Sequence, residues 1–307
     1  MKTRSIGGTR GARRAGAVWG VLFLAAAACG PAFPATLEWG TYLGGSGGDG
    51  AQSVALDGDG NLYVVGDTAS TGWVSGGWDA TFNDGVTTET DAFLVKLSPA
   101  GAHVWSTYLG GSGKESGSGV AVDGSGNVYA TGETYSAGWT SGGWDTTINE
   151  GTAGLSDGYV VKLTPAGSHA WSTYLGAIHS DYGYDIAVDG SGNVYATGET
   201  YSAGWTSDGW DTTINGGSGG YPDGYVVKLT PAGAHAWSTY LGGTADDSGY
   251  GIAVDGDGNV CATGKTTSYV TGWVSGGWNT TANGTSDGFV VKLAPAGMHV
   301  WSTYLGG

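Results

Sequence analysis

The chain repeats one pattern of apolar and polar positions four times. The segment W-x-T-Y-L-G recurs at spacings of 66, 66, 66 and 64 residues. Within each unit, four runs of strand length are apolar or alternate apolar with polar residues, which is typical of β-strands. In the second unit these runs are GVAVD (119–123), NVYATGET (127–134), DGYVVKL (157–163) and HAWSTYLG (169–176). The W-x-T-Y-L-G segments begin at Trp39, Trp105, Trp171, Trp237 and Trp301.

Turn sequences separate the four runs of each unit. Asp-Gly-x-Gly-Asn lies between the first and second runs, and Pro-Ala-Gly lies between the third and fourth. Both sequences are typical of tight hairpin turns. Because no helical period appears, the pattern predicts an all-β fold, a β-propeller of four-stranded antiparallel blades with four blades present. A parallel β-helix is the alternative, but its coils are shorter and do not need three hairpin turns.

The spacing also predicts the domain organisation. We expect a β-propeller repeat domain over 36–307, with an extra N-terminal strand at 37–44. Both ends of this domain carry the same fourth-type strand, whereas closure of four blades needs only one. We therefore expect an incomplete ring, a C-terminally truncated piece of a longer propeller. A four-bladed ring with a spare edge strand and half of a dimeric eight-blade ring are the alternatives, and unpaired terminal strands favour self-association. The blades are expected at about 46–110, 112–176, 178–242 and 244–306.

Composition and charge exclude a disordered chain and a nucleic-acid-binding function. The 63 Gly suit many turns, and 14 Trp with 17 Tyr are too many aromatic residues for a disordered chain. Lys and Arg number 11 against 27 Asp and Glu, and five of those 11 lie in the first fourteen residues. A surface this acidic repels phosphate backbones and anionic lipid, so we expect no nucleic-acid partner.

The first 35 residues predict export. A basic segment is followed by 12 apolar residues (17–28) and then by small residues, which is the layout of a signal peptide. The apolar run is too short to span a membrane, and no later segment is long enough. Two processing routes are open, ordinary cleavage between about Ala28 and Ala35, or lipidation of Cys29 as in a bacterial lipoprotein. The expected location is secreted or at the cell surface, with an outer-membrane lipoprotein as one form.

These residues resemble a known family, the bacterial SBBP β-propeller repeat, whose name refers to seven blades. The matching pieces are W-S-T-Y-L-G-G-S-G, I-A-V-D-G-x-G-N-V-Y-x-T-G, and G-W-D-T-T-x-N-G followed by D-G-Y-V-V-K-L-T-P-A-G. The resemblance runs from Trp39 to Gly307. It implies a propeller fold and an extracellular or cell-surface protein without an assigned chemistry. This chain departs from the family in having four blades and longer, Trp-rich loops.

Those loops join the second strand to the third and carry the candidate ligand-binding residues. Each has two tryptophans beside an Asp or Asn, and the alternating strand directions place all the loops on one face of the disc. Trp next to Asp or Asn suits a sugar, because the ring stacks on the pyranose while the polar group binds hydroxyls. The favoured alternative is that each pair anchors its own loop to the blade. The candidates are Trp73, Trp78, Trp139, Trp144, Trp205, Trp210, Trp273 and Trp278.

The opposite face carries the Asp-Gly-x-Gly-Asn hairpins, whose oxygen groups at alternate positions are compatible with a calcium loop. An EF-hand needs Gly at its sixth position, where Leu62 stands in the first hairpin, and Glu at its twelfth, where Thr68 stands. Because Asp, Asn and Gly also favour hairpin turns, we expect no metal and keep calcium as the alternative. The calcium candidates are Asp57, Asp59, Asp255 and Asp257.

No catalytic pattern stands out. The chain has no nucleophile elbow, zinc-ligand spacing, Rossmann fingerprint or P-loop. One His per unit follows the Pro-Ala-Gly turn, and we expect these histidines to be exposed hairpin residues. The sequence therefore predicts an exported, non-enzymatic binding module with a protein or glycan ligand at the loop face and no cofactor. A lectin-like or carbohydrate-active protein is the alternative. The four histidines are His103, His169, His235 and His299.

Overall fold

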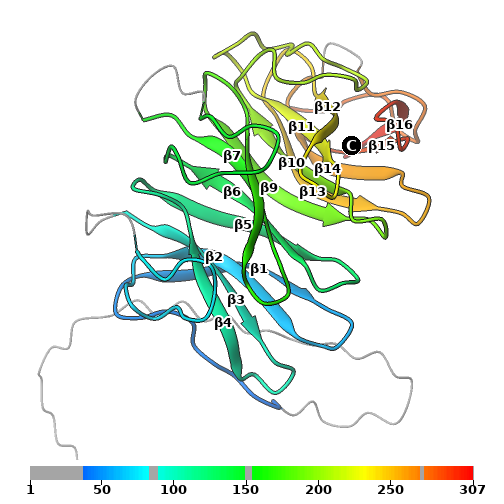
Figure 1. Ribbon diagram of the computed structural model, residues 1–307. Coiled ribbons are helices and arrows are strands. Elements are labelled where there is room, and N and C mark those ends of the chain that lie inside the picture. Colours follow the sequence, from blue (N-terminus) through cyan, green and yellow to red (C-terminus); the bar gives the residue numbers. More distant parts are fainter. Residues whose placement is uncertain (1–36, 83–88, 149–153, 270–272, 307) are drawn as a thin grey trace, which may run out of the picture. The chain divides into compact units, whose positions relative to one another are not determined.

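The computed structural model describes residues 37–306 apart from 83–88, 149–153 and 270–272. Its strands form four separate sheets of four antiparallel strands each, coloured from blue to red in Figure 1. The described residues contain no helix, so the predicted fold class is confirmed. The predicted signal peptide (1–35) and its Cys29 lie outside the described residues.

Each sheet is one blade, in which strands that follow one another in the chain are neighbours in the sheet. Blade 1 contains β1 (Asp49–Leu56), β2 (Leu62–Thr68), β3 (Asp91–Leu97) and β4 (His103–Leu109). Blade 2 contains β5 (Glu115–Val122), β6 (Val128–Thr134), β7 (Asp157–Leu163) and β8 (His169–Leu175). Blade 3 contains β9 (Asp181–Val188), β10 (Val194–Thr200), β11 (Asp223–Leu229) and β12 (His235–Leu241). Blade 4 contains β13 (Asp247–Val254), β14 (Val260–Thr266), β15 (Asp287–Leu293) and β16 (His299–Leu305).

The first strand of each blade is longer than its apolar run. It has eight residues and begins at an acidic residue, for example Glu115 in β5. A bulge between Gly117 and Gly119 shifts the register against β6, and the same shift recurs in the other blades. This bulge allows a Gly-rich segment to continue the strand, which is why the apolar pattern marks only its second half.

The apolar core lies between the blades. The first strand of each later blade packs on the first three strands of the blade before it. At one such contact, a Cβ on Gly183 in β9 would lie 2.2 Å from the Thr131 Oγ1 of β6, so only glycine permits the approach. Extensive contacts join consecutive blades, and none of that extent joins the fourth blade to the first, so the described strands form no closed ring.

The long connection between the second and third strands returns along the outer edge of the fourth strand. In blade 1, Gly76 forms a parallel bridge with Ser106 of β4, and the Ser106 N–H donates to the Ser75 carbonyl (2.8 Å). The loop therefore occupies hydrogen-bonding groups that would otherwise form an unpaired sheet edge. The equivalent bridges are Gly142–Ser172, Asp208–Ser238 and Gly276–Ser302.

The N-terminal segment 37–44 is not a strand, which corrects the prediction for it. It lies against blade 1 in the way that a preceding fourth strand would. Trp39 and Leu43 pack against an apolar cluster of β2 and β3 that includes Phe93. The equivalent residues Trp105 and Leu109 belong to the core shared with blade 2. The segment has the side chains of a fourth strand, but among the described residues no third strand lies beside it to supply the hydrogen bonds of a sheet.

Candidate functional site

The first tryptophan of each loop pair anchors the loop inside its own blade. In blade 3, Trp205 is 8% exposed and its Nε1–H donates to the Thr200 Oγ1 (3.0 Å). Its ring meets the Tyr225 ring edge to face, with centroids 5.0 Å apart. These contacts anchor the loop to its own blade through the first tryptophan. Trp73, Trp139 and Trp273 make the equivalent edge-to-face contacts at 5.0–5.1 Å.

In blades 1–3, the second tryptophan of the pair contacts the next blade. Trp144 of blade 2 stacks on His235 of blade 3, with ring centroids 4.3 Å apart, and lies 6.4 Å from Trp205. Trp144 is still 37% exposed. The same His contact joins Trp78 to His169 and Trp210 to His299. Trp278 is 88% exposed.

The histidines at these contacts are not exposed hairpin residues, which corrects the prediction for three of them. His169, His235 and His299 are each half-buried under a tryptophan ring, and burial lowers the pKa of each. The Nε2 of each ring lies 2.9 Å from a serine Oγ on the same strand, as in the His235–Ser238 pair. Only His103, in blade 1, is exposed as expected.

An open hollow lies at the junction between blades 2 and 3, and a second lies at the equivalent place between blades 3 and 4. The first is walled by Trp144 and Trp205, and the second by Trp210 and Trp273. The sequence predicted tryptophans on one loop face, and the structure instead brings the second Trp of one blade to the first Trp of the next. The polar lining includes Asp145 in the first hollow, and Asp211 and Asn215 in the second.

The polar groups of the second hollow are held in place by its own loop. Asp211 accepts a hydrogen bond from the Thr213 N–H (2.9 Å) through Oδ1 and one from the Asn215 Nδ2 (3.1 Å) through Oδ2. The Asp211 N–H in turn donates to the Thr239 Oγ1 of β12 (2.8 Å). A fixed carboxylate and amide beside two indole rings can bind the hydroxyl groups and apolar face of a ligand at once.

Buried acids lie directly behind the wall of this hollow. The Asn215 N–H donates to Asp223 Oδ2 (2.9 Å), and the N–H of Gly243, another lining residue, donates to Asp247 Oδ2 (2.7 Å). Burial raises the pKa of Asp223, the nearby Asp247 charge acts in the same direction, and together they bring it to about 8. Burial likewise raises the pKa of Asp247. Asp223 is therefore mostly neutral at pH 7.

The same kind of acid begins the first strand of every blade, and sequence reasoning missed it. Asp181 accepts hydrogen bonds from Thr200 Oγ1, from Ser202 Oγ (2.7 Å) and from the Ala177 N–H (2.9 Å). Burial outweighs these donors and raises its pKa to about 7, as it does for Glu115. The signal was present, because an acid and a T-x-S sequence recur at fixed positions of every repeat. The four acids are Asp49, Glu115, Asp181 and Asp247.

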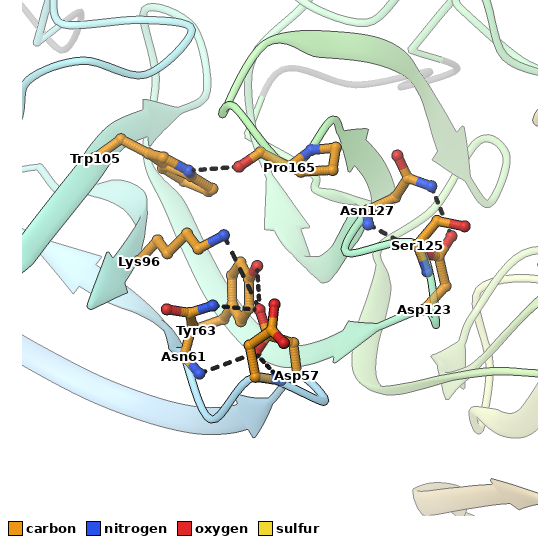
Figure 2. A network of polar contacts seen from close by, with 10 residues as sticks. Asp57, Asn61, Tyr63, Lys96, Trp105, Asp123, Ser125, Asn127 and Pro165 are labelled. Carbon is orange, nitrogen blue, oxygen red and sulfur yellow. Dashed lines mark hydrogen bonds and ion pairs between the residues drawn. The ribbon is translucent and has the colours of Figure 1, made fainter. Parts of the chain in front are cut away.

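The hairpin acids at the other end of the blades are occupied by their own turns (Figure 2). Asp57 accepts hydrogen bonds from the backbone N–H of Asp59 (3.0 Å) and Asn61 (2.9 Å), and from the Tyr63 hydroxyl (3.1 Å). Burial raises its pKa, but the Asn61 side-chain amide (2.8 Å) and these donors outweigh burial, so the pKa is lowered overall. Lys96 lies 4.0 Å from Asp57 and over the Tyr63 ring.

The calcium candidates Asp59 and Asp257 are exposed at the tips of these turns, and their backbone N–H groups donate to Asp57 and Asp255. The side chain of Asn259 holds Asp255 as Asn61 holds Asp57, and lowers the pKa of Asp255 to about 2. Across the described residues, no group of three or more His, Cys, Asp and Glu side chains is placed to bind a metal ion.

A hydrogen bond from the fourth strand fastens each blade to the next. The Trp105 Nε1–H donates to the Pro165 carbonyl of the following blade (3.1 Å), as Figure 2 shows. The turn at Pro165 brings Gly167 against the Trp105 ring with φ near +78°. A Cβ on Gly167 would lie 2.8 Å from that ring, so the Pro-Ala-Gly sequence is required by the junction as well as by the turn. The equivalent bonds are Trp39–Pro99, Trp171–Pro231 and Trp237–Pro295.

Comparison with known proteins supports the repeat. The SBBP beta-propeller repeat model matches residues 38–72, 104–142, 170–204 and 236–270. Each match runs from the fourth-type segment through the first two strands of the next blade. No curated protein matches the chain. None of the described segments is a helix with the length and apolar character needed to cross a bilayer.

Solved structures also match the chain. One of them is described as an X-ray structure of a "putative gluconolactonase in protein family". It is 14% identical, with a TM-score of 0.31, and the match covers 69% of this chain and 54% of that one. The chain thus spans about half the length of this solved structure.

Proposed function

The chain carries four copies of the SBBP β-propeller repeat and belongs to that repeat family, and from this premise we propose that it is an exported, non-enzymatic binding module that takes carbohydrate at its blade junctions. The hollow between Trp144 and Trp205 carries this proposal, together with its counterpart between Trp210 and Trp273. Each combines two indole rings with an aspartate, which are the groups that a pyranose needs for its apolar face and its hydroxyls.

The two hollows occupy equivalent positions on consecutive junctions, and this favours a repeating ligand. A polysaccharide presents the same sugar at regular intervals, so one chain can occupy both sites. The second contact is then intramolecular and raises the overall affinity without any new kind of interaction. The acidic surface of the described chain favours neutral or cationic glycans over anionic ones.

The distribution of titratable groups supports binding rather than catalysis. The hairpin acids and the acids of the first strands recur in each described blade, and hydrogen bonds of the fold hold them. A catalytic site is a constellation of groups around one reacting atom, and repetition of the same acids does not provide one. Export is supported by the basic and apolar sequence of the first 35 residues.

A glycan array probed with the full chain tests the proposal. We expect binding to a neutral polysaccharide, weakened at least about tenfold by Trp144→Ala and by Trp210→Ala, as for a buried aromatic contact at an interface. Trp278→Ala is the matched control, since Trp278 has the same place in the repeat but lines neither hollow. It should bind as the wild type does.

The stacking of Trp144 on His235 makes the alanine variants a risk for the fold, so a second variant is needed. Trp144→Phe keeps an aromatic ring on His235 while reducing the indole wall of the hollow. We expect it to melt near the wild-type temperature and to bind more weakly. A folded wild type that binds no glycan, or a Trp144→Phe variant that binds as well as the wild type, contradicts the carbohydrate proposal.

A further inference from the structure

Blade 2 holds an ammonium group of its own between an acid and an aromatic ring. The Lys114 Nζ lies 3.2 Å from the Glu133 Oε1 and over the Tyr135 ring, 5.9 Å from its centroid. Burial lowers the pKa of Lys114, but Glu133 and Tyr135 outweigh burial, so the pKa is raised overall and the ammonium form is favoured. A carboxylate and a ring face that converge in this way form a site for an alkylammonium group.

Blade 3 repeats this site without its cation. Glu199 and Tyr201 stand at the positions of the acid and the ring, but Ser180 stands at the position of the lysine. The Tyr201 N–H donates to the Ser180 carbonyl (3.1 Å), and the equivalent hydrogen bond of blade 2 is 3.0 Å long, so the backbone of the site is retained. Burial raises the pKa of Tyr201, and the nearby Glu199 acts in the same direction. The acid and the ring are therefore neighbours in blade 3 as well.

Three further tyrosines lie beside Glu199, on strands β9 and β13, which pack against each other (Figure 1). Tyr182 is the cross-strand neighbour of Glu199, and its ring stacks on that of Tyr184 with centroids 6.2 Å apart. The Tyr184 ring lies 5.7 Å from the ring of Tyr250 in the next blade, at an angle of 45°. The Tyr184 hydroxyl and the Ser248 Oγ (2.6 Å) both donate to Glu199. These bonds hold the carboxylate beside the aromatic rings.

The tyrosines of β9 are not required by the blade itself. Blades 1 and 2 form the same sheet with small or polar residues at these two positions, which are Gly50 and Gln52 in β1 and Ser116 and Ser118 in β5. The rings are thus added in the blade where the lysine is missing. The side chains of Tyr182, Tyr184 and Glu199 are partly exposed, so a ligand can reach them.

The charge of Glu199 is not balanced within the described residues. Lys265 of β14 takes part in none of the ion pairs that the described side chains form, which are Lys96–Asp57, Lys114–Glu133 and Lys292–Asp255. Asp246 of the following blade also acts on the Tyr201 hydroxyl, so it adds a second acid to the site. Two acids beside ring faces attract a cation from outside the chain.

We propose that Glu199, Tyr201 and the tyrosines of β9 bind an external alkylammonium ion at the place that Lys114 occupies in blade 2. The positive head of such an ion meets the carboxylate, and its alkyl stem packs on the rings, as the stem of a lysine side chain does. The proposal is independent of the carbohydrate site, because none of these residues lines either hollow.

Isothermal titration calorimetry of the full chain with n-butylammonium chloride at low ionic strength tests the proposal. Butylammonium has the head and stem of a lysine side chain, and we expect one site per chain. Glu199→Gln should weaken binding at least about tenfold, as the loss of a hydrogen bond to a charged group does. Glu133→Gln is the matched control, since Lys114 already fills that site, and it should bind as the wild type does.

Two further variants keep the test independent of the fold. Ser180→Lys places in blade 3 the lysine that blade 2 has, on a partly exposed position. We expect this variant to melt no lower than the wild type and to lose butylammonium binding, because its own ammonium group occupies the site. Tyr201→Leu should weaken binding about two- to fivefold, which is the contribution of a partly exposed cation–π contact.

A blocked pentalysine peptide distinguishes two sources of the ammonium group. Tighter binding per ammonium group than butylammonium shows, provided that Glu199→Gln weakens it, assigns the site to a lysine of a polypeptide, and equal binding assigns it to a free amine. A wild type that does not bind butylammonium would overturn the proposal, as would a folded Ser180→Lys or Glu199→Gln variant that binds it as the wild type does. Glycan binding at the hollows would be unchanged by these variants, so the two proposals fail separately.

Discussion

Replacement of Asp223 by Asn should change how the stability of the protein depends on pH. An unfolded Asp ionises near its ordinary pKa of 3.8, whereas burial keeps the pKa of Asp223 at about 8 in the folded chain. Between these two values the unfolded chain releases a proton that the folded chain retains. The free energy of unfolding therefore falls as pH rises through this window, by about 1.4 kcal/mol per pH unit for one such group.

The size of the effect follows from the width of the window. From about pH 4.5 to about pH 7.5, Asp223 alone lowers the free energy of unfolding by on the order of 4 kcal/mol. Asparagine is neutral throughout this pH range, and its side-chain oxygen can still accept the Asn215 N–H. The free energy of unfolding of the variant therefore does not fall with pH on account of this residue. Its amide places donors beside the buried Oδ1 position, which has no partner among the described residues, at a cost of about 1–3 kcal/mol.

The two stability curves should therefore cross. Near pH 4.5 we expect Asp223→Asn to be less stable than the wild type, and near pH 7.5 to be more stable. Urea unfolding followed by tryptophan fluorescence at a series of pH values measures both curves. Asp59→Asn is the control, since Asp59 is exposed and stands where Ser125 and Ser191 stand in other blades. Parallel curves for Asp223→Asn and the wild type would refute the reasoning.

Three further predictions concern the turns and the junctions. Gly167→Ala should lower the free energy of unfolding by at least about 1 kcal/mol, because it strains a positive φ and places a methyl group against the Trp105 ring. In the control Gly190→Ala the added methyl group meets nothing within 4 Å, so the change should be nearly neutral. Thermal unfolding of both variants tests this, and equal melting temperatures would contradict it. Asp208→Gly should raise the free energy of unfolding by about 1 kcal/mol, because Asp208 has φ near +61° at a position where the other blades have glycine. A urea titration measures this, and a less stable variant would show that other contacts hold Asp208 in this conformation. Calcium or a chelator should leave the melting temperature unchanged, since Asp57 already accepts hydrogen bonds from its own turn, and a shift on calcium addition would show that the turn can open to bind the ion.

The features that the sequence predicts well are local. Alternation in DGYVVKL gives β7, and the Pro-Ala-Gly turn that follows gives its hairpin with β8, because both patterns lie within a few residues. The repeat then extends one blade to four. The acids of the first strands have a repeated signal too, but its meaning appears only when Asp181 is seen beside Thr200 and Ser202, about 20 residues later.

The junctions could not be predicted in the same way. Trp144 and His235 are 91 positions apart, and nothing in their local sequence says that one stacks on the other. Placement of the loops by strand direction alone puts all eight loop tryptophans on one face. The bridge from Gly142 to Ser172 instead carries the loop down the outer edge of the blade, and this brings Trp144 to the neighbouring blade. This bridge outside the regular strands therefore places the second tryptophan at the junction with the next blade rather than on the loop face.

Because the same residues form the hollows and join the blades, binding and stability must be linked at each junction. Trp144 belongs to blade 2 and Trp205 to blade 3, so a sugar held between them contacts both blades at once. In an array of repeats, stability depends on the interfaces between neighbours, and a ligand that binds only the folded junction stabilises it by mass action. A bound glycan should therefore raise the melting temperature of the chain. The same glycan should fail to do so in Trp144→Ala, where one wall of the hollow between these two blades is removed.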